Sequence, residues 1–244
     1  MEKKSELLVK EKQLVAPGDV VARGLEYLPG SGCYRKTGDI KSKLLGLVRL
    51  KDRVVGVTPL AGVYIPKPGD GIIASVTDLQ STFWILDINS PYDAILQLGE
   101  ATAEYVDTAK TDLSSFFDVG DVVYIKVLNV SHSKHTTLTM NDYRAKKLIA
   151  GRLMKVTPSK VPRIIGKEGS MIELIKKYTG CHIVVGQNGM VWLKGSNEAL
   201  AAKAVLKIEG EAHISGLTDR VTAMLKAEGT PEPETAQPEE EGGA

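Results

Sequence analysis

Two glycines three positions apart, Gly166 and Gly169, divide a stretch whose apolar residues otherwise recur at helical spacing. Residues 161–165 predict a short helix before them. After them, the apolar residues of 170–179 follow a 3.6-residue period, which predicts a second helix that ends at Gly180. A helix–loop–helix with the loop sequence Gly-Lys-Glu-Gly is the strongest constraint on how this part of the chain folds.

The segments around this loop complete an α/β pattern. The chain leading into the first helix, from residue 151, predicts a strand. Residues 181–195 predict two strands joined at an Asn-Gly pair, a strong hairpin signal, and residues 196–213 predict a final helix. The order β-α-α-β-β-α indicates a small α/β domain over residues 148–226.

The Gly-Lys-Glu-Gly loop has the chemistry of a contact with a phosphate chain. Glycines lack a Cβ, so the backbone at these positions can approach a sugar-phosphate chain closely. The loop amides lie at the start of the second helix, where the helix dipole favours an anion, and Lys167 adds a positive charge. A turn that only connects two helices is the alternative interpretation of a bare Gly-x-x-Gly.

Two β-rich segments precede this domain. Residues 66–147 show a polar insertion after the third of five strand candidates, which predicts a small five-stranded OB-type barrel. Residues 1–65 predict a small β domain with a hairpin at Lys51-Asp52. The Glu- and Pro-rich residues 227–244 predict a disordered tail. The five strand candidates are residues 70–80, 81–89, 92–98, 121–132 and 135–142.

Charge is distributed unevenly along a chain whose formal net charge is only +1. Between Lys134 and Lys177, eleven Lys and Arg residues stand against three acidic residues. Such a run is either a solvated surface or the electrostatic footprint for a polyanion, because phosphate neutralisation supplies most non-specific nucleic-acid affinity.

The sequence speaks against several other classes of protein. No run of about 18 apolar residues exists, so no membrane span is expected, and the charged N-terminus lacks the apolar core of a secretory signal. Cys33 and Cys181 are too far apart in the sequence for a zinc cluster, and a reducing cytoplasm is the expected location. His132 and His135 have no cysteine or third histidine nearby, so neither a metal site nor a cofactor is expected.

Residues 161–185, VPRIIGKEGSMIELIKKYTGCHIVV, resemble the KH domain, an RNA- and ssDNA-binding module whose GXXG loop holds the nucleic-acid backbone. The preceding barrel is similar to the OB-type RNA-binding domain named after ribosomal protein S-one. A barrel followed by a KH domain, behind a small β domain, resembles the RNA-binding cap subunits of the exosome, in particular the archaeal ones. Residues 186–189, Gly-Gln-Asn-Gly, match the family's G-x-N-G signature, and residues 213–220 match its C-terminal stretch. The resemblance covers roughly residues 10–225.

The resemblance implies a fold and a role. The fold is mainly β plus α/β: an N-terminal β domain, a five-stranded OB-type barrel and a type I KH domain. In the family, three non-catalytic cap subunits sit on a ring of phosphorolytic exonuclease subunits and guide the 3′ ends of single-stranded RNA into it for degradation or processing. The barrels line the entry pore, and the N-terminal domain docks on the ring.

Two alternatives to this role come from different classes of protein. Bacterial polynucleotide phosphorylase, an enzyme, carries similar modules in the opposite order, behind catalytic domains for which this chain has no room. A stand-alone RNA-binding regulator of translation or RNA stability is the other alternative. A free-standing regulator has no need of the N-terminal docking domain, so that domain favours the cap subunit.

The resemblance and the charge pattern together select candidate RNA contacts. Phe83 and Trp84 stand where such barrels usually carry an aromatic-Gly pair, and strand alternation sends one of them to each face, so one can stack on a base. The KH loop, the barrel's last hairpin and the basic segment after it supply the others. The candidates are Gly166, Lys167, Glu168, Gly169, Arg163, Phe83, Trp84, His132, Lys134, Arg144, Lys146 and Lys147.

Overall fold

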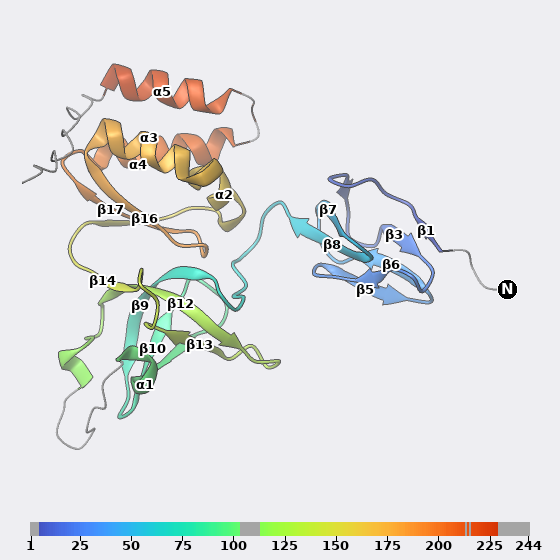
Figure 1. Ribbon diagram of the computed structural model, residues 1–244, viewed down its shortest axis with the longest axis horizontal. Coiled ribbons are helices and arrows are strands. Elements are labelled where there is room, and N and C mark those ends of the chain that lie inside the picture. Colours follow the sequence, from blue (N-terminus) through green and yellow to red (C-terminus); the bar gives the residue numbers. More distant parts are fainter. Residues whose placement is uncertain (1–4, 103–112, 213, 215, 229–244) are drawn as a thin grey trace, which may run out of the picture. The chain divides into compact units, whose positions relative to one another are not determined.

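The computed structural model describes residues 5–102, 113–212, 214 and 216–228. The chain divides into two compact units after Gly62 (Figure 1). The expected fold class, β-rich domains followed by an α/β domain, is confirmed. Within the described ranges, no helix is long and apolar enough to cross a membrane.

The first unit consists of two four-stranded sheets around a shared core. Val21, Ile40, Val48 and Val55 lie in this core because alternate residues of each strand face it. The hairpin expected at Lys51-Asp52 joins two of its strands in register. One sheet has the order β1 (Glu6–Leu7), β3 (Val20–Arg23), β6 (Asp39–Ser42) and β5 (Cys33–Lys36); the other has β2 (Leu14–Val15), β7 (Gly46–Lys51), β8 (Val54–Pro59) and β4 (Leu28–Pro29).

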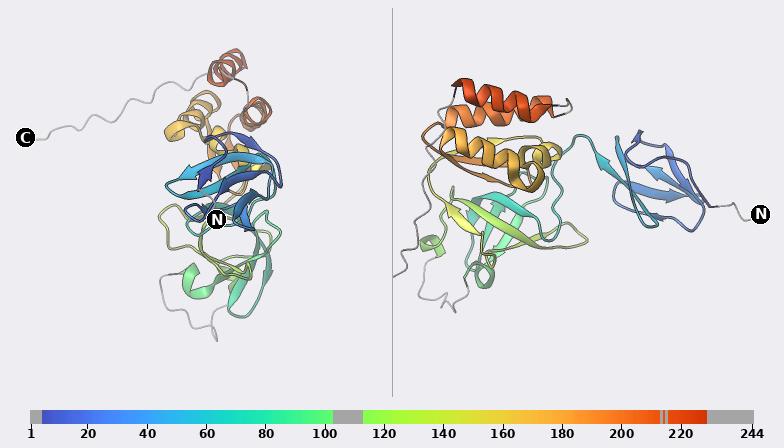
Figure 2. Two further views of the ribbon diagram at one scale, coloured as in Figure 1. Left: turned by 90° about the vertical axis from the view of Figure 1, so that its right-hand side faces the viewer. Right: turned by 45° about the horizontal axis from the view of Figure 1, so that its top comes forward.

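The second unit begins with a closed barrel. Five strands run in the order β9-β10-β11-β13-β12, and β12 pairs again with β9, which closes the sheet (Figure 2). Alternate residues of β12, among them Val123, Ile125 and Val127, face the barrel core. The strands are β9 (Gly71–Leu79), β10 (Phe83–Asp87), β11 (Ala94–Gln97), β12 (Val122–Val130) and β13 (Thr136–Thr139).

The insertion after the third strand starts with helix α1 (Leu98–Ala101) and ends with the 3-10 helix η1 (Leu113–Ser115). Residues 103–112 lie outside the described ranges. The Leu113 side chain is buried in the barrel core, so the end of the insertion is anchored there.

The last barrel strand is interrupted. β13 pairs with the C-terminal half of β12, and the short strand β14 (Lys146–Leu148) pairs with its N-terminal half. Residues 140–145 between them leave the ladder and project from the barrel wall. The sequence predicted one strand over 135–142 and did not predict this break.

The α/β domain follows the predicted order. Its three-stranded sheet has β17 in the centre, and its four α-helices lie on one face of that sheet (Figure 1). The strands are β15 (Arg152–Lys155), β16 (Cys181–Val185) and β17 (Met190–Gly195). The helices are η2 (Pro158–Lys160), α2 (Val161–Ile165), η3 (Lys167–Gly169), α3 (Ser170–Thr179), α4 (Glu198–Glu211) and α5 (Leu217–Glu228).

The helical layer buries its apolar stripe against the sheet. Ile164, Ile175, Leu193 and Val205 come from different elements and meet in one core. Helix α5, which the sequence did not predict as a separate element, adds Val221 and a neighbouring leucine to that core. The helix runs through Glu228, so the tail expected from residue 227 can start only after it, and residues 229–244 lie outside the described ranges.

Candidate RNA interface

The Gly-Lys-Glu-Gly loop has backbone angles that glycines adopt readily and other residues adopt only at a cost. Gly166 has φ 76° and ψ 177°, and a Cβ there would lie 2.8 Å from both the backbone nitrogen and the Cβ of Met171. Gly169 has φ 88° and forms the N-cap of α3. Glu168 also has a positive φ, 55°, which costs a non-glycine residue roughly 1–3 kcal/mol. The loop is therefore held in a strained shape in front of the N-terminus of a ten-residue helix.

The side chains of this loop are presented to solvent. Lys167 and Glu168 are exposed, and Arg163 is exposed in the last turn of α2. A groove in this region is lined by Pro162, Ile165 and Gly166 of the helix–loop segment and by Gln187 of the hairpin turn. A phosphate chain that lies along this groove would meet the loop amides, the dipole of α3 and two cations.

The Gly-Gln-Asn-Gly turn has a different task. Asn188 is completely buried, and its side-chain amide donates to the carbonyl oxygens of Ile73 (2.7 Å) and Ile88 (2.8 Å) in the barrel. Its Oδ1 accepts from the backbone nitrogen of Ile73 (3.3 Å). Gly186 is needed for space, because a Cβ there would lie 2.4 Å from the Asn188 Oδ1. The turn joins the α/β domain to the barrel.

Asn188 can bond to Ile73 because the hydrogen-bond ladder between β10 and β9 ends before Ile73. The pairing of β10 with β9 stops at Asp87↔Ser75, and two residues further in the same register would pair Asn89 with Ile73. Asn89 turns away instead, with φ 55°. The carboxamide of Asn188 carries a donor and an acceptor like a peptide group, and it satisfies Ile73 in place of the missing strand.

The aromatic pair on the second barrel strand separates as alternation requires. Trp84 is fully buried, its Nε1 donates to the Phe117 carbonyl oxygen (2.9 Å), and its ring packs edge-to-face on Phe117. The sequence proposal of Trp84 as an RNA contact is therefore wrong, since this face of the strand is the barrel core. Phe83 is half-buried on the opposite face and stays a candidate.

The barrel's last hairpin exposes His132, Lys134 and His135. Its turn is closed by Ser131, whose backbone nitrogen donates to the His135 carbonyl oxygen (2.9 Å) and whose Oγ accepts from the His135 nitrogen (3.0 Å). Lys134 has φ 70° and ends the turn, where its backbone nitrogen donates to the Ser131 carbonyl oxygen (3.0 Å). Among the described residues, no group of three or more His, Cys, Asp and Glu side chains gathers as metal ligands would.

The basic residues after that hairpin do not form one track. Lys146 and Lys147 alternate on β14, so they point to opposite faces. Lys147 forms an ion pair with Asp121. Burial raises the pKa of Asp121, but the bond from Lys147 and a backbone N–H outweigh it and leave the pKa lowered. The charge of Lys147 is thus largely neutralised by Asp121.

Lys146 faces the α/β domain. Its Nζ lies 3.3 Å from Nε2 of His182, the second residue of β16. Burial lowers the pKa of His182, and the nearby ammonium groups of Lys146 and Lys176 lower it further. The imidazole packs edge-to-face on Trp192. The sequence singled out neither His182 nor Lys176, because the contact joins two domains.

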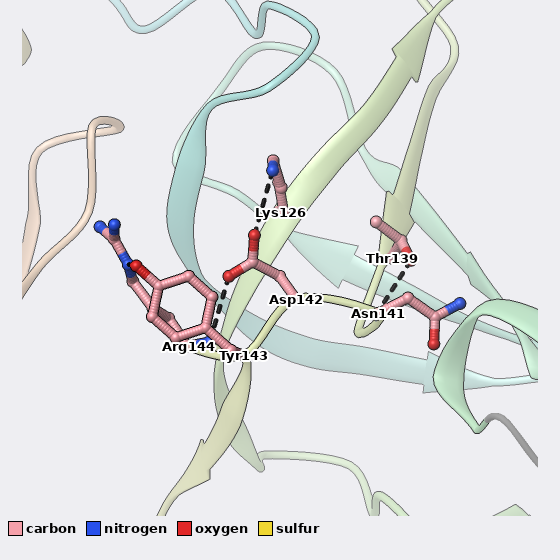
Figure 3. A network of polar contacts seen from close by, with 6 residues as sticks. All are labelled: Lys126, Thr139, Asn141, Asp142, Tyr143 and Arg144. Atoms are coloured by element: carbon pink, nitrogen blue, oxygen red, sulfur yellow. Dashed lines mark hydrogen bonds and ion pairs between the residues drawn. The ribbon is translucent and has the colours of Figure 1, made fainter.

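Arg144 belongs to a small polar network in the projecting segment (Figure 3). The Asp142 carboxylate accepts from the Arg144 backbone nitrogen and from Nζ of Lys126, both at 3.0 Å, and these two bonds lower the pKa of Asp142. The Arg144 Nε donates to the Tyr143 hydroxyl (2.6 Å), and its guanidinium carbon lies 4.9 Å from the centre of the Tyr143 ring. Tyr143, absent from the sequence candidates, is 86% exposed.

Comparison with known proteins agrees with this architecture. A family model described as "KH domain" matches residues 151–199. "Exosome complex component Rrp4" of Pyrococcus abyssi is 42% identical over 224 residues, which cover 90% of this chain and 84% of that protein. The protein of the same name from Methanothermus fervidus is 43% identical over 221 residues, with coverages of 90% and 97%.

The chain belongs to the Rrp4 family of archaeal exosome components. A crystal structure provisionally described as an exosome complex RNA-binding protein has a similar fold, with a TM-score of 0.63 and 32% identity. The match covers 68% of this chain and 97% of the chain in that structure. The expected family is therefore confirmed.

Within this Rrp4-family chain, the structure separates the twelve candidates by place. The KH loop residues and Arg163 lie in one continuous segment, of which Gly166 lines the first groove. Arg144 and Lys146 line a second groove, between the barrel and β16. Phe83 and the hairpin residues His132 and Lys134 belong to neither lining.

Proposed function

We propose that this chain is a non-catalytic RNA-binding cap subunit of an archaeal exosome. It recruits single-stranded RNA and guides the 3′ end to a phosphorolytic exonuclease ring for degradation or processing. The observation that carries the proposal is a KH domain with a strained, solvent-facing GXXG loop in a chain of the Rrp4 family. The relatives' name, exosome complex component, supports the multi-subunit setting.

In this proposal the KH loop binds the RNA backbone rather than particular bases. The loop amides in front of α3 and the ammonium of Lys167 contact phosphates, and Arg163 adds a second charge beside them. With 5% aromatic residues, the chain offers few stacking platforms, so charge supplies most of the affinity. Phe83 and the barrel hairpin with His132 and Lys134 guide the strand across the barrel.

The first unit is the proposed docking module for the ring. Two cross-strand pairs on one of its sheets, Leu14–Leu47 and Leu28–Val54, place apolar side chains on the exposed face. Leu25, just before β4, is 81% exposed. Covering exposed apolar side chains of this kind with a partner removes them from water and so favours binding. By analogy with the cap that the chain resembles, we propose three copies per ring and a cytoplasmic location.

Two measurements test the proposal. Fluorescence anisotropy with a labelled oligoribonucleotide should show RNA binding whose affinity falls steeply with salt, and the purified chain with phosphate should leave that RNA intact. Size-exclusion chromatography with candidate ring subunits should show co-elution. Phosphate-dependent shortening of the RNA by the chain alone would refute the non-catalytic role. RNA binding without co-elution would favour a stand-alone regulator.

A further inference from the structure

A groove lies where the projecting segment 140–145 of the barrel and β14 face the KH strand β16. It is lined by the edge of β16 and by six side chains: Tyr124, Tyr143, Arg144, Lys146, Lys176 and His182. Three of these side chains are permanent cations, and none of the residues in the described lining is acidic. The groove therefore combines positive charge with exposed aromatic surface.

The aromatic surface is preoriented. Tyr143 is 86% exposed, yet its ring is held by the guanidinium of Arg144 on one side and by the hydrogen bond to its hydroxyl. Arg144 is fixed in turn through its backbone bond to Asp142 (Figure 3). A ring fixed in this way loses little conformational freedom when a planar group stacks on its open face. Nucleic-acid bases stack on such rings without regard to sequence.

The positive end of the groove suits a phosphate. Lys146 contacts an imidazole, not a carboxylate, and Lys176 approaches the same imidazole from α3. The lowered pKa of His182 reports the resulting positive field, after burial. An anion between these groups would relieve the repulsion among them. β16 is also an edge strand of its sheet, and four of its residues line the groove.

We propose that this groove holds one nucleotide of single-stranded RNA, with its base on Tyr143 and its phosphate between Lys146, Lys176 and His182. The inference rests on the proposed RNA-binding function and adds a contact separate from the GXXG loop. Because its two walls come from the barrel and the KH domain, RNA bound there lies across the junction of both domains. An acidic peptide would use the cations but would leave the tyrosine platform unused.

The first test compares two double substitutions of equal charge. The variant Lys146→Gln with Lys176→Gln should bind a fluorescein-labelled ten-nucleotide oligouridylate on the order of tenfold more weakly than the full-length wild type. The slope of log affinity against log salt should fall by about 0.7, the contribution of one single-strand phosphate contact. The control, Lys207→Gln with Lys226→Gln on α4 and α5, lies outside the groove lining and should change affinity less than twofold.

The second test separates stacking from charge. Tyr143→Ala should lower the affinity on the order of tenfold, whereas Tyr143→Phe keeps the ring and should remain close to the wild type. Circular dichroism should match the wild type for both variants, because the side chain is almost fully exposed. Equal affinity of the Ala and Phe variants would refute stacking on Tyr143.

The third test reads His182 directly by NMR titration of its imidazole. Oligouridylate should raise its pKa, because a bound phosphate offsets the positive field of Lys146 and Lys176, which adds to burial in lowering that pKa in the free protein. Arg144, Tyr124 and Tyr143 also line the groove, and Trp192 packs on the imidazole. RNA binding then takes up a proton, so affinity is highest below the pKa of the free protein. It falls as pH rises through the pKa of the complex, and His182→Gln should remove this dependence.

The outcomes distinguish the two proposals. A wild-type chain that binds no RNA overturns both. If the wild type binds with a steep salt dependence, but the groove double variant matches its control and the His182 pKa does not move, the groove assignment falls and the proposed function stands. Equal displacement of the RNA by a polyglutamate peptide would assign the groove to acidic proteins and would also overturn the inference.

Discussion

Asn188 should contribute more to the stability of the second unit than any exposed loop residue. Replacing it with alanine removes three hydrogen bonds, to the nitrogen and oxygen of Ile73 and to the oxygen of Ile88. These backbone groups lie inside a buried junction, and each one left unpaired costs roughly 1–3 kcal/mol. Since single substitutions rarely cost more than about 5 kcal/mol, we expect Asn188→Ala to lower the free energy of unfolding by about 3–5 kcal/mol.

The assay is urea unfolding followed by tryptophan fluorescence. Both tryptophans of the chain, Trp84 and Trp192, belong to the second unit, so the signal reports that unit and not the first. Gln187→Ala, one residue away and exposed, is the matched control and should stay within about 0.5 kcal/mol. A loss below about 1 kcal/mol for Asn188→Ala, with an unchanged m-value, would refute the reasoning.

Asn188→Asp sharpens the test, because it keeps the shape and changes only the donor. The carboxylate would face the carbonyl oxygens of Ile73 and Ile88, which now lack a donor, so the charged form is disfavoured and its folded-state pKa is raised. The protonated acid can donate to one of them. Stability should therefore be highest at low pH and should fall as pH rises from about 4, the unfolded pKa, through the raised folded value.

Three further outcomes follow from the same structure. Gly166→Asp combined with Gly169→Asp should weaken RNA binding at least tenfold, through charge repulsion at the loop, while circular dichroism shows the KH domain still folded; unchanged affinity would remove the loop as a contact. Trp84→Ala should cost about 3–5 kcal/mol of stability in urea unfolding, since it empties the barrel core. Asp121→Asn should flatten the acid limb of the stability curve, because the lowered pKa of Asp121 contributes stability at neutral pH that is lost as pH falls through the folded value; an identical limb would show that the pair with Lys147 contributes nothing.

Local patterns predicted most of the fold. The strand alternation in the barrel and the period of 170–179 are short-range consequences of which residues face a core, so they are visible in the sequence. The same alternation predicted that Phe83 and Trp84 would lie on opposite faces of their strand, but not which of them faces the barrel core. That depends on Phe117, 33 positions away, which accepts the Trp84 hydrogen bond.

The sites were less predictable because they depend on contacts between distant segments. Asn188 was read as part of a hairpin turn, and its bonds to residues 115 and 100 positions away have no local signature. A polar residue between two glycines was the available signal. The groove beside β16 was missed for the same reason, since Tyr143 and His182 come close only when both domains fold. The basic run did not separate Lys146, which faces the groove, from Lys147, which is paired with Asp121.

The interruption between β13 and β14 has a consequence for how such chains can change. Each of the two strands holds its own register on β12, so residues inserted or deleted within 140–145 shift neither pairing. A barrel with an unbroken last strand would pass every length change into its core. Here the wall of the groove can be lengthened or shortened while the barrel stays closed. If the groove binds RNA as proposed, insertions and deletions in this segment would alter RNA preference without disturbing the barrel.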